Sequence, residues 1–170
     1  AGNAAAESLR KHDMTGKIII FSKEKYPFYY VPALPEFLAG EKDIKGLIIH
    51  DLDWYEKNQI DLHLETGIAG IDPAQKSVVT EKGERYRYDK LLLATGASAN
   101  VPANLSTEFE NVFTLHGVRD AEGIKTALAD NRARDVVIIG GGLLGIEMTQ
   151  AFVSRGARVT ILEKRTHILP

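Results

Sequence analysis

The stretch Val136-Val137-Ile138-Ile139-Gly140-Gly141-Gly142-Leu143-Leu144-Gly145 places the pattern GxGxxG directly after an apolar run. The run predicts a buried parallel strand, and the glycines predict a tight turn into a helix. Gly140 permits the turn, Gly142 lets bare backbone approach a pyrophosphate, and Gly145 lets the helix lie close to the sheet. The helix start offers free N–H groups and the positive end of a dipole. The stretch therefore predicts half of a dinucleotide-binding sheet.

The next apolar run predicts the strand that completes this βαβ unit. It covers residues 157–162, and Glu163 follows it directly. An acid at this place accepts hydrogen bonds from a ribose 2′-hydroxyl and repels a 2′-phosphate, which favours NAD(H). Lys164 and Arg165 could attract that phosphate, so NADP(H) stays open. Glu163 could also be only an exposed charge at a strand end.

The overall composition favours a cytoplasmic protein that binds no metal, no nucleic acid and no membrane. Lys and Arg number 21 and Asp and Glu number 23, so a net charge of −2 predicts no basic binding surface. The apolar runs are too short to span a bilayer, and the five histidines lack the spacing of metal ligands. There is no cysteine, which removes disulfides, thiolate ligands and a cysteine nucleophile from these 170 residues.

The first 22 residues repeat the pattern of the second unit. Residues 2–5 match residues 142–145, and Ser22 takes the place of Glu163. On this interpretation the chain starts inside its first fingerprint, without the preceding strand, and we expect a piece of a larger protein. The alternative is an alanine-rich surface helix over residues 1–15.

The segments between the two units predict further short elements. A proline-rich aromatic cluster predicts a rigid extended turn, and Asp51 and Asp53 predict a helix cap. The expected elements are a strand over 17–22, the rigid turn over 26–35, helices over 36–40, 54–58 and 121–129, an antiparallel meander from the runs in 60–79 and 84–88, a buried strand over 89–97 and a loop over 100–111.

Three stretches together resemble a known family of flavoproteins. They are residues 2–5, residues 88–97 and residues 140–147 with Glu163. The chain is similar to FAD-dependent pyridine nucleotide-disulfide oxidoreductases of the NADH oxidase, rubredoxin reductase and nitrite reductase large-subunit type. The resemblance implies an α/β fold with two Rossmann-like βαβ dinucleotide-binding units and a small antiparallel β-meander, truncated. Residues 1–112 would form an FAD-binding domain that lacks its first strand, and residues 113–170 the N-terminal half of an NAD(H)-binding domain.

The resemblance also implies an activity. A hydride would pass from NADH to FAD, and the electrons would go on to a small redox protein such as rubredoxin or to another acceptor. Disulfide reductases of the superfamily use a cysteine beside the flavin; without one, electrons would leave the flavin directly. The alternatives are the flavin reductase portion of a nitrite reductase and a non-catalytic nucleotide-binding fragment. The oligomeric state stays open, with a homo-oligomer as one alternative.

Several residues acquire expected roles from this resemblance. Glu147 would approach the nicotinamide as the candidate catalytic residue, or it could be an acid that merely stabilises the first turn of its helix. Val31 and Glu36 stand where redoxin-reducing relatives often have an arginine and a lysine. The expected FAD contacts are Gly2, Asn3 and Ala4 at the pyrophosphate, Ser22 and Glu24 at the ribose, Tyr30, Val31 and Pro32 near the isoalloxazine, the backbone of Ala69 at the adenine, and Thr95 and Gly96. The expected NAD(H) contacts are Gly140, Gly142, Leu143, Leu144, Gly145 and Glu163.

Overall fold

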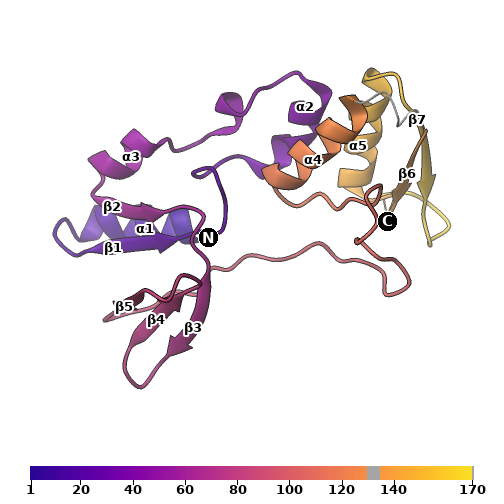
Figure 1. Ribbon diagram of the computed structural model, residues 1–170. Helices are drawn as coiled ribbons and strands as arrows, with labels where there is room; N and C mark the ends of the chain where they lie inside the picture. Colours follow the sequence, from indigo (N-terminus) through magenta and orange to yellow (C-terminus); the bar gives the residue numbers. More distant parts are fainter. Residues whose placement is uncertain (130–134, 170) are drawn as a thin grey trace. The chain divides into compact units, whose positions relative to one another are not determined.

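The computed structural model describes residues 1–129 and 135–169. The chain forms two compact units, drawn in Figure 1. Unit 1 comprises Ala1–Tyr29 and Ile48–Ala97, and unit 2 comprises Tyr30–Leu47 and Ser98–Pro170. No helix in the described ranges is long and apolar enough to cross a membrane.

Unit 1 contains a two-stranded parallel sheet packed against α1 (Gly2–His12). The strands are β1 (Ile18–Phe21) and β2 (Ile60–His63), and Ile18 pairs with Ile60. Ala6 of α1 lies in one apolar cluster with Ile60 and with Tyr55 from α3 (Leu52–Lys57). The predicted helix cap is confirmed, because the Asp51 side chain accepts a hydrogen bond from the Trp54 N–H.

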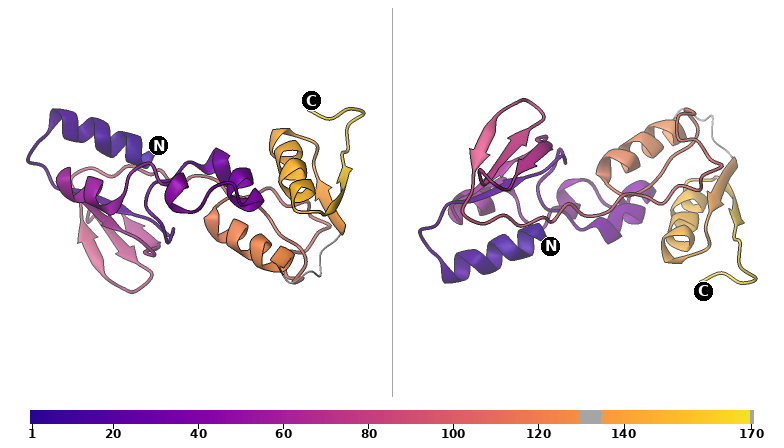
Figure 2. Two further views of the ribbon diagram at one scale, coloured as in Figure 1. Left: turned by 90° about the horizontal axis from the view of Figure 1, so that it is seen from above. Right: turned by 90° about the horizontal axis from the view of Figure 1, so that it is seen from below.

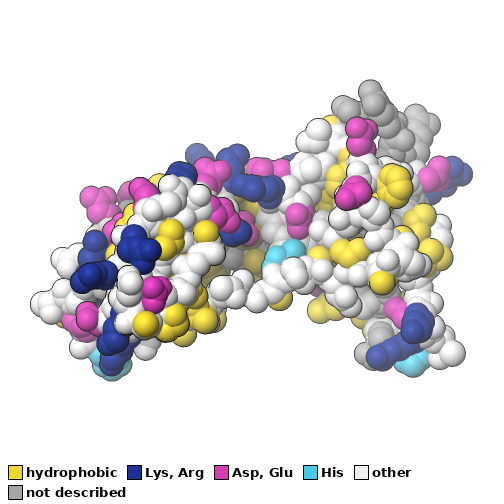
Figure 3. Space-filling view, turned by 60° about the horizontal axis from the view of Figure 1, so that its bottom comes forward, with side chains coloured by type: hydrophobic (Ala, Val, Ile, Leu, Met, Phe, Trp, Pro, Cys, Tyr) yellow, Lys and Arg dark blue, Asp and Glu magenta, His cyan; other side chains and the backbone are white. Residues whose placement is uncertain are grey.

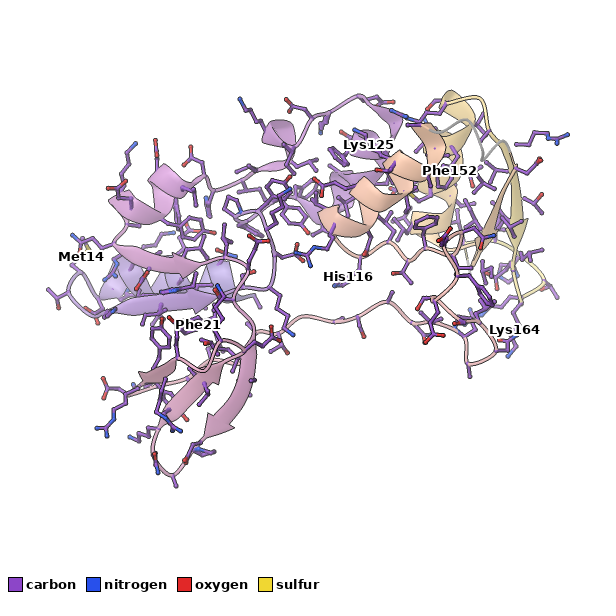
Figure 4. The ribbon with its side chains drawn as sticks, viewed as in Figure 1. Met14, Phe21, His116, Lys125, Phe152 and Lys164 are labelled. Atoms are coloured by element: carbon purple, nitrogen blue, oxygen red, sulfur yellow. The ribbon has the colours of Figure 1, made fainter. Side chains whose placement is uncertain are left out.

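The meander of unit 1 has three antiparallel strands, β3 (Ile68–Asp72), β4 (Ser77–Thr80) and β5 (Arg85–Arg87). The prediction that placed residues 60–63 in this meander is wrong, because they form β2 and pair with β1 instead. Phe21 points from β1 towards the meander (Figure 4), and its ring centroid lies 4.8 Å from that of Tyr86 on β5. This aromatic contact joins the two sheets.

The predicted buried strand over residues 89–97 is also wrong. These residues form no strand, and Leu92 and Leu93 are 60% and 65% exposed. An apolar run needs a neighbouring strand to complete its hydrogen bonds. Neither sheet described in unit 1 pairs with this run.

Three helices form the core of unit 2, and Figure 2 shows them packed together. They are α2 (Leu34–Ala39), which begins two residues before the predicted helix, α4 (Val118–Ala129) and α5 (Leu143–Ser154). Two short 3₁₀ turns, η1 (Val31–Ala33) and η2 (Lys45–Leu47), flank α2. The buried side chains are Leu34, Phe37, Leu38, Val118, Ala121, Ile124, Met148, Ala151 and Phe152.

The sheet described in unit 2 is the predicted parallel pair, β6 (Asp135–Ile139) and β7 (Arg158–Leu162). Alternate residues of both strands face α5 and are partly buried. The opposite face is exposed, with Val137 at 59%, Ile139 at 55% and Leu162 at 53%. The prediction of a strand buried on both faces is therefore wrong for one face of β6.

Candidate functional site

The glycine loop of unit 2 connects β6 to α5 by a tight turn. Gly140 has φ +112°, a conformation that favours glycine, and its N–H donates to the Leu162 carbonyl at 2.8 Å. A Cβ on Gly145 would overlap the carbonyl oxygen of Gly140, so only glycine allows this approach of helix and loop. A Cβ on Gly142 would meet no described atom within 4 Å. The loop is thus tight at Gly140 and Gly145 and open at Gly142.

The first turn of α5 follows directly at this opening. Its N-cap is Gly142, which has no side chain that can accept the first N–H groups. Leu143 and Leu144 are 68% and 45% exposed, so the helix start faces open space. This is the backbone arrangement that binds anions at helix N-termini.

Glu163 is fixed beside the glycine loop. Its Oε2 accepts the Gly141 N–H at 2.7 Å, and its Oε1 accepts the Arg165 N–H at 2.8 Å. The N–H groups of Arg165 and Gly141 are the main reason that the pKa of the Glu163 carboxyl lies below its ordinary value of 4.5. The carboxylate therefore stays ionised at neutral pH, in one orientation, with lone pairs left to accept further donors.

Residues 164–169, called here the returning segment, bring the chain back to the same loop. The Leu169 N–H donates to the Gly141 carbonyl at 2.7 Å. Gly141 is thus bonded through both backbone groups, although the GxGxxG pattern does not require a glycine there. Sequence reasoning missed this residue. Lys164 and Arg165 are exposed, and Figure 4 labels Lys164 after the end of β7.

Glu147 lies on α5, one turn after the glycine loop, and is exposed. Its proximity to a nicotinamide stays a prediction. The early position in the helix also fits the simpler alternative, in which an acid interacts favourably with the helix dipole.

The start of α1 in unit 1 resembles the start of α5. Its N-cap, Ala1, has no side-chain acceptor, and the Ala5 N–H donates to the Ala1 carbonyl at 2.9 Å. A Cβ on Gly2 would lie 3.4 Å from Cβ of Ala94, next to Thr95 and Gly96. The structure thus brings the 94–96 element to the first turn of α1.

A tyrosine that the sequence analysis did not single out orients Asn3. The Tyr55 hydroxyl donates to Oδ1 of Asn3 and accepts the Phe28 N–H at 3.4 Å. Burial raises the pKa of this phenol, so the hydroxyl keeps its proton. Asn3 Oδ1 is therefore engaged by Tyr55, which fixes the orientation of the Asn3 amide.

The two candidate ribose contacts of unit 1 hold the turn after β1. The Ser22 hydroxyl accepts the Glu24 N–H at 3.2 Å, and the Tyr29 hydroxyl donates to Oε2 of Glu24 at 3.3 Å. Ala69 lies on β3 at a register shift between Ile68 and Gly70. A bulge leaves its extra residue outside the ladder, so the Ala69 backbone is available for other hydrogen bonds.

The remaining expected flavin contacts belong to unit 2. Tyr30 is the N-cap of η1, and Val31 and Pro32 form its first residues. Tyr30 is 54% exposed and its N–H donates to the Leu47 carbonyl at 2.9 Å. Within residues 1–129 and 135–169, no group of three His, Asp or Glu side chains could hold a metal ion.

Comparison with known proteins places the chain in a family. The family model described as pyridine nucleotide-disulphide oxidoreductase matches residues 1–170. This chain belongs to the pyridine nucleotide-disulphide oxidoreductase family. Similar proteins include the NADH-rubredoxin oxidoreductase of Clostridium acetobutylicum, which is 38% identical over 162 residues, and the rubredoxin-NAD(+) reductase of Pseudomonas putida, which is 35% identical over 170 residues.

The chain spans less than half the length of these family members. The alignment with the Clostridium acetobutylicum protein covers 94% of this chain and 40% of that protein. The alignment with the Pseudomonas putida protein covers 99% of this chain and 44% of that protein. Among solved structures, a covalent complex of putidaredoxin reductase with putidaredoxin matches with a TM-score of 0.85 and 27% identity. That match covers 96% of this chain and 40% of the reductase. The family and the predicted Rossmann-type α/β fold are thereby confirmed.

Proposed function

We propose that this chain is part of an FAD-dependent NAD(P)H oxidoreductase that passes a hydride from NADH to FAD and electrons on to a small redox protein. The observation that carries the proposal is the presence, in one chain, of two helix starts without side-chain caps, one of them beside an ionised carboxylate. Each can accept a pyrophosphate. Flavin and nicotinamide, when bound, supply the hydride chemistry, so the protein contributes orientation and electrostatics.

Unit 2 supplies the residues for NADH. The N–H groups of Leu143 and Leu144 would bind the pyrophosphate across the opening at Gly142. Glu163 would accept hydrogen bonds from the adenosine ribose, and its charge would disfavour a 2′-phosphate. Glu147 would lie towards the nicotinamide end. NADPH remains an alternative because Lys164 and Arg165, which directly follow Glu163, are exposed cations that could attract a 2′-phosphate.

Unit 1 supplies most of the residues for FAD. The N–H groups of Gly2, Asn3 and Ala4 would bind its pyrophosphate. The close approach of Gly2 to Ala94 supports this fit, because the small side chains keep the helix start free of bulk. The remaining proposed contacts are Ser22 and Glu24 at the ribose, the Ala69 backbone at the adenine, Thr95 and Gly96, and Tyr30, Val31 and Pro32 near the isoalloxazine. We retain residues 1–112 and 113–170 as the proposed FAD and NAD(H) domains.

The proposed electron acceptor is a small redox protein such as rubredoxin. Two relatives carry rubredoxin in their names, and the matched complex contains putidaredoxin. The 170 residues contain no cysteine, so no thiol of this segment can relay the electrons.

The test uses the purified chain with added FAD. We expect FAD to remain bound through gel filtration, and its absorbance near about 450 nm to bleach on addition of NADH. A colourless protein that still binds NADH would instead support the non-catalytic nucleotide-binding fragment. A chain that binds neither nucleotide would refute the proposal.

A pair of variants at Gly142 separates folding from NADH binding. Gly142→Asp puts a carboxylate into the open space at the helix start, where φ −77° and ψ −178° suit an N-cap residue. We expect the helix to be kept or stabilised and NADH binding to be lost through charge repulsion. Gly142→Asn is the matched neutral control and should retain more of the binding. Equal NADH affinity in both variants would contradict an anion site at this helix.

A further inference from the structure

Gly141 is the buried centre of the loop in unit 2. Its N–H bonds to the Glu163 carboxylate and its carbonyl accepts from Leu169, both at 2.7 Å. The glycine loop, which would bind the pyrophosphate, is therefore hydrogen-bonded both to Glu163, which would bind the ribose, and to Leu169 at the end of the returning segment. Both bonds are made by backbone groups of Gly141, so any residue except proline could make them if space allowed.

A side chain at Gly141 would press against the returning segment and against Glu163. A Cβ there would lie 2.8 Å from Cγ2 of Ile168 and 3.3 Å from Oε2 of Glu163. The φ of Gly141 is not positive, so a side chain there is opposed by steric contact with the returning segment and not by backbone strain. Ile168 is 51% exposed, and removing its branches would open room without emptying a core.

We propose that Gly141 is a positioning residue that fixes Glu163 and the returning segment against the glycine loop, and thereby sets the preference for NADH over NADPH. This inference rests on the proposed function. A carboxylate held by Gly141 and Arg165 cannot turn away to admit a 2′-phosphate. Once the Gly141 contact is lost, the bond from the Arg165 N–H is left to orient Glu163, and the carboxylate can swing about it. The exposed cations at Lys164 and Arg165 can then pair with that phosphate.

The test compares Gly141→Ala, Ile168→Ala and the double variant in the full 170-residue chain. NADH and NADPH are titrated separately, and amide hydrogen exchange is measured at Leu169. We expect Gly141→Ala to lower NADH affinity about tenfold, to reduce the NADH/NADPH affinity ratio, and to abolish protection of the Leu169 amide. The double variant should recover part of all three, because the 2.8 Å contact with Cγ2 of Ile168 is gone and the remaining contacts, with Cβ of residue 168 and Oε2 of Glu163, are at 3.3 Å.

Gly123→Ala is the matched control, since a Cβ on this α4 glycine would lie 3.9 Å from the Phe113 ring and meets only ordinary contact. It should leave NADH affinity unchanged. Should Gly141→Ala fail to fold, Leu169→Pro removes the Leu169 N–H donor and cannot adopt the φ of +52° that Leu169 has. It therefore detaches the returning segment from the loop and should lower the NADH/NADPH affinity ratio in the same direction.

Each result bears on the inference. The inference would be overturned if Gly141→Ala left the NADH/NADPH affinity ratio unchanged, or if the double variant recovered none of the lost NADH affinity. In either case, NADH binding by the unmutated chain would still support the proposed function. If the Leu169 amide of the Gly141→Ala variant stayed protected from hydrogen exchange, the inference would be overturned by a measurement that needs no nucleotide. An unmutated chain that binds neither NADH nor NADPH would overturn both the proposed function and this inference.

Discussion

Replacing Arg10 by methionine should destabilise unit 1 far more than a surface substitution. Arg10 is 6% exposed, and its guanidinium donates to four backbone carbonyls. Nε and Nη2 bind the carbonyls of Asn58 and Gln59, both at 2.7 Å, and Nη1 binds those of Asp13 at 2.8 Å and Gly16 at 3.0 Å. The side chain thus ties the end of α1 to the α3–β2 connection.

The magnitude follows from these four bonds. A hydrogen bond from a charged donor contributes about 1.5 to 3 kcal/mol, but carbonyls near the surface regain water when the donor is removed. Methionine keeps most of the aliphatic stem, so the loss is electrostatic rather than a cavity. Counting the bonds to Asn58 and Gln59 in full and the others as rehydrated gives a loss of about 3 kcal/mol or more. With a urea slope of about 1.5 kcal/mol per molar, the midpoint would fall by about 2 M.

Trp54 makes the assay specific. It is the single tryptophan of the chain and lies on α3 in unit 1, so its fluorescence reports unfolding of this unit. Lys11→Met is the matched control, because Lys11 is exposed and pairs with Glu7 one turn away, and an ion pair at the surface contributes little to stability. A midpoint for Arg10→Met within about 0.3 M of that control would refute the reasoning.

Three further substitutions test the sites. Glu163→Gln should weaken NADH binding more than NADPH binding. Because the pKa of Glu163 is lowered on folding, its carboxylate stabilises unit 2 above pH 4.5 and loses that effect as the pH falls through the folded-state pKa. An acid titration followed by circular dichroism should therefore be flatter in the variant than in the unmutated chain. Tyr55→Phe should lower FAD affinity severalfold in a fluorescence titration, since it releases the Asn3 side chain, and unchanged affinity would contradict that role. Gly145→Ala should lower the free energy of unfolding by about 1 to 3 kcal/mol and reduce NADH binding, because its Cβ would overlap the Gly140 carbonyl; a variant of full stability would mean that the loop yields easily.

Local chemistry made the glycine loop and its helix predictable from sequence. The conformation at Gly140 and the close approach at Gly145 depend on residues within one turn of each other, and so does the Asp51 cap. The pairing partner of residues 60–63 was not predictable in the same way. Their apolar alternation suits a strand in either sheet, and the pairing with β1 joins segments about forty residues apart.

The residues that hold the candidate sites in place were harder to find than the glycines. From the sequence alone, Arg10 is indistinguishable from an exposed charged residue on a helix. Its partners, the carbonyls of Asn58 and Gln59, lie 48 and 49 residues away in the sequence and reach it only in the folded chain. Tyr55 has the same character, since its contact with Asn3 spans 52 residues. Such contacts depend on tertiary packing, which a local pattern does not encode.

The two repeated units differ most where the second strand of each ends, and this difference bears on ligand choice. In unit 2 Glu163 directly follows the strand, and its carboxylate accepts the Gly141 N–H of the glycine loop. In unit 1 the same place holds Ser22, whose hydroxyl accepts the Glu24 N–H within its own turn. A neutral hydroxyl adds no charge beside the start of α1, whereas the carboxylate of Glu163 adds a full negative charge beside the start of α5. The repeated backbone thus presents an uncapped helix start twice. We expect the residue after the strand to make only the proposed NAD(H) site in unit 2 selective against an additional phosphate.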